Sequence, residues 1–201
     1  MRKKPMAVVG FVVLFLLTVV PSAGAVPQTD CTDVQYNATD PYEVWNARQL
    51  QCMSSDGDYG LQSDINLSGT EFKPIPSWNR TFGNSTRDSE EFTGSLEGNG
   101  YEITGLSVYQ PDEKYVGLFE SVGEGASVTN LKLRDVNVTG RSHVGGLAGD
   151  VASGGEVSGV TVEGRVSGDS NVGGVVGMNT GEVTDVSAQV NVSGDNDVGR
   201  L

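Results

Sequence analysis

Short segments in which apolar and polar residues alternate recur through the second half of the chain. Each segment has three to six residues, is rich in valine, and has the period of two that is typical of β-strands. Glycine, aspartate, asparagine and serine separate the segments and favour tight corners. Residues 94–201 contain 22 of the 28 glycines, which weaken helices. The pattern therefore predicts an all-β fold of short strands.

One phrase returns at a nearly fixed distance. It occurs at residues 116–120 (VGLFE), 144–149 (VGGLAG), 172–177 (VGGVVG) and 198–201 (VGRL). The aligned positions Gly117, Gly146, Gly174 and Arg200 are 29, 28 and 26 residues apart. A fixed period of this length is typical of a solenoid. A β-sandwich also has short strands and glycine turns, but it predicts no such period.

The predicted fold is a right-handed parallel β-helix (β-solenoid) of about 26–29 residues per coil, with three strands in each coil and an N-terminal helical cap. The apolar positions in residues 103–108 match those in residues 128–133, so the two segments are predicted to be equivalent parts of their coils. Stacked coils, about 4.8 Å apart, would place equivalent residues in columns. The predicted core columns are Val128/Val157/Val183, Leu131/Val160/Val186, Leu133/Val162/Ala188 and Val138/Val166/Val192.

The phrases at 144–149 and 172–177 resemble the GLUG repeat. Residues 59–69, 72–75 and 92–106 resemble the way in which such proteins begin, so the resemblance covers roughly residues 40–201. It implies a secreted or cell-surface protein, since the repeat occurs in some adhesins and IgA-specific peptidases. No peptidase motif is visible, and Arg200 stands where the family has glycine.

The first 25 residues have the composition of a secretory signal peptide. Three basic residues precede an apolar run at 7–20, and small residues follow at 23–25. The run is shorter than the roughly 20 residues of a bilayer span. We predict export, with no membrane span after cleavage; an uncleaved anchor is the alternative.

Residues 26–93 are predicted to cap the solenoid formed by residues 94–201. Asp40 and Pro41 resemble a helix start and predict a helix over 41–53. Trp45 and Trp78 are expected to add apolar cover, and residues 76–91 to form a polar loop. Cys31 and Cys52 are the only cysteines and predict a disulfide, because an even pair in an exported protein usually bonds. Two free thiols are the alternative.

The charge excludes a nucleic-acid partner. Without residues 1–25, 176 residues contain 10 basic and 26 acidic side chains, a net charge of −16. Such an acidic surface indicates adaptation to high salt, or simply an acidic exported protein. Six N-x-S/T sequons are glycosylation candidates: Asn37, Asn66, Asn79, Asn84, Asn137 and Asn191.

No constellation for catalysis, a cofactor or a metal emerges. His143 is the only histidine and is expected at an exposed corner, and Asp135 and Asp185 occupy different points of their repeats. Acidic turns at 56–58 and 195–197 lack calcium-loop spacing. We therefore predict a non-enzymatic surface module with a structural or adhesive role.

Three further expectations concern activity and partners. A carbohydrate-active β-helix enzyme (polysaccharide lyase or glycosidase) and the N-terminal stalk of a larger surface protein are the alternatives. Expected partners are surface glycans or other cell-surface proteins. The chain stops within a fourth phrase, which predicts truncation or end-to-end self-association through an open edge.

Overall fold

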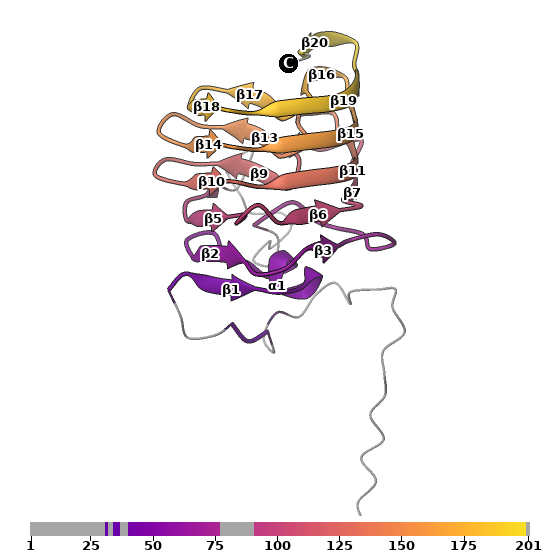
Figure 1. The fold of residues 1–201 in the computed structure, drawn as a ribbon. Coiled ribbons are helices and arrows are strands. Elements are labelled where there is room, and N and C mark those ends of the chain that lie inside the picture. The colour runs from indigo at the N-terminus through magenta and orange to yellow at the C-terminus, as the bar shows by residue number, and fades with distance from the viewer. Residues whose placement is uncertain (1–30, 32–33, 37–39, 77–90, 200–201) are drawn as a thin grey trace, which may run out of the picture.

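The computed structural model describes residue 31 and residues 34–36, 40–76 and 91–199. The predicted signal peptide, most of the predicted polar loop, Trp78 and Arg200 lie outside the described residues. The strands lie in four sheets, which we name A to D, and every strand pair is parallel. The β-solenoid is thus confirmed (Figure 1).

Sheets A and B are the longer pair. Sheet A contains, in spatial order, β1 (Tyr42–Val44), β2 (Asp58–Leu61), β5 (Ser95–Glu97), β10 (Ser127–Thr129), β14 (Glu156–Ser158) and β18 (Glu182–Thr184). Sheet B contains β3 (Ile65–Asn66), β6 (Glu102–Thr104), β11 (Lys132–Thr139), β15 (Thr161–Ser167) and β19 (Ser187–Ser193), with β7 (Ser107–Tyr109) also paired to β11.

Sheets C and D are shorter. Sheet C contains β4 (Glu91–Phe92), β9 (Phe119–Val122), β13 (Ala148–Val151) and β17 (Val176–Asn179). Sheet D contains β8 (Lys114–Val116), β12 (Ser142–Val144), β16 (Ser170–Gly173) and β20 (Asn196–Gly199). A complete coil therefore has four strands, taken in the order A, B, D, C, rather than the predicted three.

The repeated glycine phrase explains the additional strand. The phrase joins a strand of sheet D to one of sheet C through a bend at residues 145–147 in one coil and 174–175 in the next. A Cβ on Gly145 would overlap the carbonyl oxygen of Ala148, and one on Gly173 would overlap that of Val176. The chain turns so tightly there that one phrase contains the end of one strand and the start of the next.

The predicted core columns lie in register. Val128, Val157 and Val183 pair in sequence, as do Leu133/Val162/Ala188 and Val138/Val166/Val192 in sheet B. Leu131 and Val160 are fully buried, and Val186 packs against the same core. The rings of Phe92 and Phe119 meet within the core at a centroid distance of 5.0 Å.

The alignment of residues 103–108 with 128–133 is wrong. Ile103 pairs with Leu133 and Val108 with Val138, whereas Val128 pairs with Leu96. The corner between β5 and β6 is longer than the one between β10 and β11, so similar phrases fall at different points of their coils.

The N-terminal region differs most from the prediction. Tyr42–Val44 is strand β1, which pairs with β2, and the helix α1 spans only Ala47–Gln51. Its N-cap is Asn46, whose Oδ1 accepts a hydrogen bond from the backbone N–H of Gln49 at 3.0 Å, so Asp40 does not cap a helix. Since β1 and β2 already belong to sheet A, coils begin within the predicted cap.

The helix contributes to the core, but Trp45 does not. Leu50 of α1 and Met53 beyond it are fully buried, whereas Trp45 is half exposed. The indole Nε1–H of Trp45 donates a hydrogen bond to Glu43. Cys31 and Cys52 form a disulfide with a Cα–Cα distance of 5.6 Å, which ties residue 31 to the C-cap of the helix.

Candidate functional site

The outer face of sheet B is a continuous polar surface. Along β11, buried apolar residues alternate with exposed polar ones, except at a bulge between Leu133 and Val136. The strands lie in register, so the outward residues form columns across the coils. Asn66, Thr104 and Arg134 pair in one column, Glu163 and Gln189 pair in another, and the bulge of β11 lies between the two sets.

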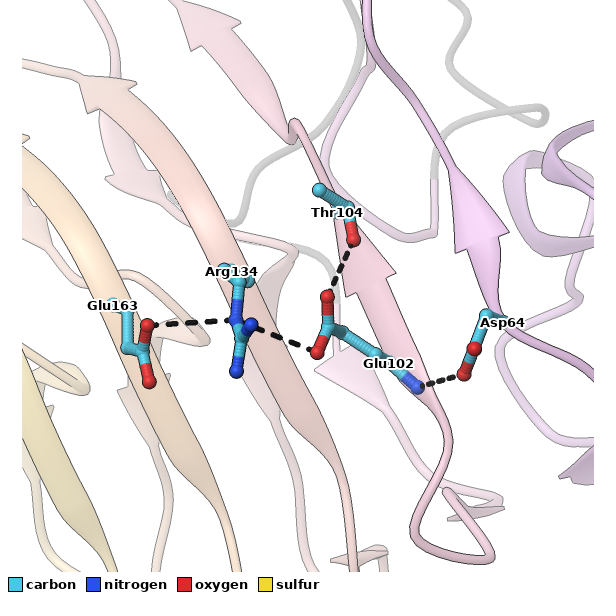
Figure 2. Close-up of polar contacts among 5 residues, drawn as sticks. All are labelled: Asp64, Glu102, Thr104, Arg134 and Glu163. Carbon is cyan, nitrogen blue, oxygen red and sulfur yellow. Dashed lines mark hydrogen bonds and ion pairs between the residues drawn. The ribbon is translucent and has the colours of Figure 1, made fainter.

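Arg134 joins carboxylates from the coils on either side of its own (Figure 2). Its Nε lies 3.4 Å from Oε2 of Glu102 and 3.5 Å from Oε2 of Glu163. The Oγ1–H of Thr104 donates to Glu102 at 2.8 Å, and the backbone N–H of Glu102 donates to Asp64 at 2.9 Å. The network links strands or corners of four successive coils. The Arg134 side chain is 50% exposed, so the energy of each pair is small.

The described sequons lie on the same face. Asn66, Asn137 and Asn191 are exposed residues of β3, β11 and β19. Asn137 and Asn191 both pair with Arg165 of β15, so the three form one column. The candidates Asn37, Asn79 and Asn84 lie outside the described residues.

His143 is not the exposed corner residue that the sequence predicts. It is half-buried in β12, at the position that Tyr115, Asn171 and Asp197 occupy in neighbouring coils. All four have a positive φ, between 49° and 59°. The imidazole stacks on the Tyr115 ring at 4.7 Å, and its buried Nδ1 has no hydrogen-bond partner among the described residues. Burial lowers the pKa of His143, with Lys114 adding to this effect and Asp150 opposing it.

Asp150 faces the same region from sheet C. It lies in one column with Ser121 and Glu91, and the Ser121 hydroxyl donates to its Oδ2 at 3.5 Å. Its Oδ1 is buried and has no hydrogen-bond partner in the part of the chain that the structure describes. Burial raises the pKa of the Asp150 carboxyl; the charge of Glu91 adds to this, whereas His143 and Ser121 oppose it.

These residues do not form a working nucleophilic triad. Ser121 is 1% exposed, so its hydroxyl cannot reach a substrate, and that hydroxyl is bonded to Asp150 rather than to His143, so the histidine does not activate it. Asp150 could not be recognised as a candidate from the sequence, because a single aspartate after a glycine matches no motif. Asp150 comes near His143 only through the turn between sheets D and C. Asp135 lies at the bulge of β11 and Asp185 at the corner after β18, which confirms that they form no row.

The described residues contain neither a metal-binding cluster nor a membrane-spanning helix. Within residues 31, 34–36, 40–76 and 91–199, no group of three or more histidine, cysteine or acidic side chains could hold a metal ion. None of the helices in these ranges combines the length and the apolar character required to cross a bilayer.

The last described coil is open. The outer edges of β17, β18, β19 and β20 pair with no other described strand. A hollow of about 550 Å³ lies there, lined largely by apolar residues that include Val175, Val183, Val186 and Val198.

Comparisons with known proteins place the chain beside much longer ones. It is 38% identical over 150 residues to halomucin of Haloquadratum walsbyi, covering 70% of this chain and 2% of that protein. It is 36% identical over 81 residues to a Gly-rich membrane protein of Evansella cellulosilytica, covering 40% of this chain and 9% of the relative. It is 30% identical over 125 residues to the immunoglobulin A1 protease of Streptococcus sanguinis, covering 60% and 6%. The chain thus spans less than a tenth of the length of these relatives.

A solved structure and the family models complete the comparison. A protein from Bacteroides ovatus, described as a candidate immunoglobulin A1 protease, aligns with a TM-score of 0.41 and 18% identity over 80% of this chain and 70% of its own. No family model matches the chain.

Proposed function

We propose that this chain is a non-enzymatic β-solenoid module of an exported or cell-surface protein, with a structural or adhesive role. The observation that carries the proposal is the stack itself. Four parallel sheets run through the coils around one apolar core, and polar residues in columns cover the outside of sheet B. Such a stack is a rigid support with long side faces, which suits contact with an extended partner.

Three other observations support an extracellular location. Residues 1–25 have the composition of a signal peptide, and the repeated phrases resemble the GLUG repeat of secreted and surface proteins. The similarity to halomucin and to immunoglobulin A1 proteases supports the same class. The expected partners are surface glycans or other cell-surface proteins.

A binding screen tests this proposal. The refolded chain from residue 26 is tested in molar KCl against a glycan array and against immobilised surface proteins. The control is Val160→Asp, which is expected to unfold the stack, whereas Glu156→Gln changes only an exposed side chain of β14. We expect binding by the native chain and by Glu156→Gln but not by Val160→Asp. Equal binding by all three would show adsorption without a fold-dependent surface and would contradict the adhesive role.

A carbohydrate-active enzyme is the second candidate, favoured by one observation. Glu91 and Asp150 are carboxylates in one column of sheet C, and the pKa of Asp150 is raised by burial. Glycosidases use two carboxylates, one of which stays protonated to act as the acid. Incubation with polysaccharides, followed by a reducing-end assay, tests this. We expect no turnover, whereas cleavage that Asp150→Asn abolishes would establish the enzyme.

One property of the whole protein follows as a proposal. The large excess in length of the relatives supports a module or stalk within a longer surface protein.

A further inference from the structure

The structure sorts the described sequons onto one side of the solenoid. Asn66, Asn137 and Asn191 all belong to sheet B and are all exposed. The residues that follow them, Leu67, Val138 and Val192, are all buried. Since successive side chains of a strand point to opposite faces, the three asparagines project outward from the same sheet.

Two of these asparagines are related by the register. Asn137 and Asn191 both pair with Arg165, so they lie two coils apart in one column, about 10 Å from each other. Beneath them, Val138, Val166 and Val192 form an inward column of the core. A large group attached to either asparagine would extend into solvent without displacing this core.

We propose that the outer face of sheet B is N-glycosylated at Asn137 and Asn191, on alternate coils. The co-reactant is a lipid-linked glycosyl phosphate or pyrophosphate. A bond forms between the asparagine Nδ2 and C1 of the sugar, the bond between C1 and the phosphate oxygen breaks, and the amide loses one proton. The N-x-S/T sequence is the acceptor for this reaction in exported proteins.

The coil between the two sites supports this spacing. Residues 164–168 (GRVSG) keep the phrase of residues 190–194 (VNVSG) except for a valine-to-glycine change and for Arg165 in place of asparagine. Sugars on adjacent coils would start only about 4.8 Å apart and would crowd each other. Arg165 leaves one coil free between the two sugars.

Site-resolved mass spectrometry tests the proposal. The full chain is exported from an N-glycosylating host, in which a reporter glycoprotein shows that the transferase is active. Cleavage after lysine and arginine separates the sites, since the sequon of Asn137 is the only one in residues 135–141 and the sequon of Asn191 is the only one in residues 166–200. We expect a sugar on both peptides. Recovery of both peptides at their unmodified mass would overturn the proposal.

Two variants at Ser193 supply the matched control. Ser193→Thr keeps the sequon of Asn191, and Ser193→Ala removes it without changing the asparagine. The peptide 166–200 should carry the sugar in the threonine variant and be bare in the alanine variant. A sugar that persists in Ser193→Ala would show attachment elsewhere and would overturn the assignment to Asn191.

A third variant tests the alternate spacing. Arg165→Asn completes a sequon with Val166 and Ser167 on the middle coil. We expect that the column still carries two sugars, or that the fraction of folded protein falls by more than half when it carries three. Three occupied sites with an unchanged urea midpoint would refute the crowding argument.

Discussion

A carboxylate placed in the core at Val160 should unfold the solenoid. Val160 is fully buried, its column neighbours are Leu131 and Val186, and its carbonyl oxygen accepts a hydrogen bond from the backbone N–H of Ser187 on the next coil. Val160→Asp loses the burial of a valine side chain, about 1.5–3 kcal/mol. An unpaired buried charge costs about 3–5 kcal/mol more. The total of about 5–8 kcal/mol is comparable with the whole stability of a domain, about 5–15 kcal/mol.

The assay is urea unfolding followed by circular dichroism in molar KCl at pH 7. Arg165→Asp is the control, because it introduces the same side chain at an exposed position of β15 and should change stability by only about 0.5 kcal/mol. Burial raises the pKa of the introduced carboxyl at position 160 above the pKa of about 4 that carboxyls have in the unfolded chain. The loss of stability should therefore shrink as the pH falls towards about 4 and the buried carboxyl becomes protonated. Equal stability of the two variants at pH 7 would refute the assigned register of the core.

Four further outcomes are expected. The urea midpoint of the chain should rise from dilute buffer to molar KCl, because salt screens the repulsion among 26 acidic residues, and an unchanged midpoint would contradict adaptation to salt. Because the pKa of Asp150 is raised in the folded state, its carboxyl stabilises the fold below about pH 4, and this contribution is lost as the pH rises through the folded-state pKa. Asp150→Asn should therefore raise the urea midpoint at pH 7 and weaken the dependence of the midpoint on pH between about 4 and 7. Arg134→Gln should lower the free energy of unfolding by less than about 1 kcal/mol, and by less still in molar KCl, because salt screens the ion pairs. A larger loss would show that the network acts cooperatively. Cys52→Ser should cost roughly 3 kcal/mol by opening a loop of 21 residues, and thiol reduction of the native chain should reproduce that loss.

The core of the repeats was predictable because the sequence itself is periodic. Each coil must bury a side chain directly above its equivalent in the coil below, so Val128, Val157 and Val183 recur at the period of the fold. Periodicity fails where corners differ in length. The corner between Leu96 and Ile103 is longer than the corner between Val128 and Leu133. The alternation of apolar residues does not reveal this difference in length.

At the N-terminal coil the sequence predicts the wrong element for a different reason. Asp40 and Pro41 offer local signals for a helix, but Tyr42–Val44 can instead pair with β2 and extend sheet A. The rings of Tyr42 and Tyr59 lie 5.7 Å apart, and Tyr36 lies close to both. Tertiary pairing and aromatic packing therefore outweigh local helix propensity at this end of the stack.

The candidate sites divide in the same way. The shared position of Asn137 and Asn191 follows from the period alone. The bridging role of Arg134 does not, because the bulge after Leu133 adds a residue between that arginine and the asparagine column. The approach of His143 to Asp150 depends on the tight turn between sheets D and C. The repeated phrase predicts that a turn occurs there but not the direction that the chain takes after it.

Stacking in register has a consequence for the kind of function that this fold supports. The neighbours of an outward side chain come from other coils, as Glu102 and Glu163 do for Arg134 and Asn137 and Asn191 do for Arg165. A catalytic site needs several different groups at one point, whereas columns place side chains at equal intervals along the stack. Equal intervals favour weak contacts made many times, whose combined affinity exceeds that of any one contact when the partner repeats at a matching distance. The proposed adhesive or structural role is based on this arrangement, which suits an extended surface or polymer as the partner better than a small substrate.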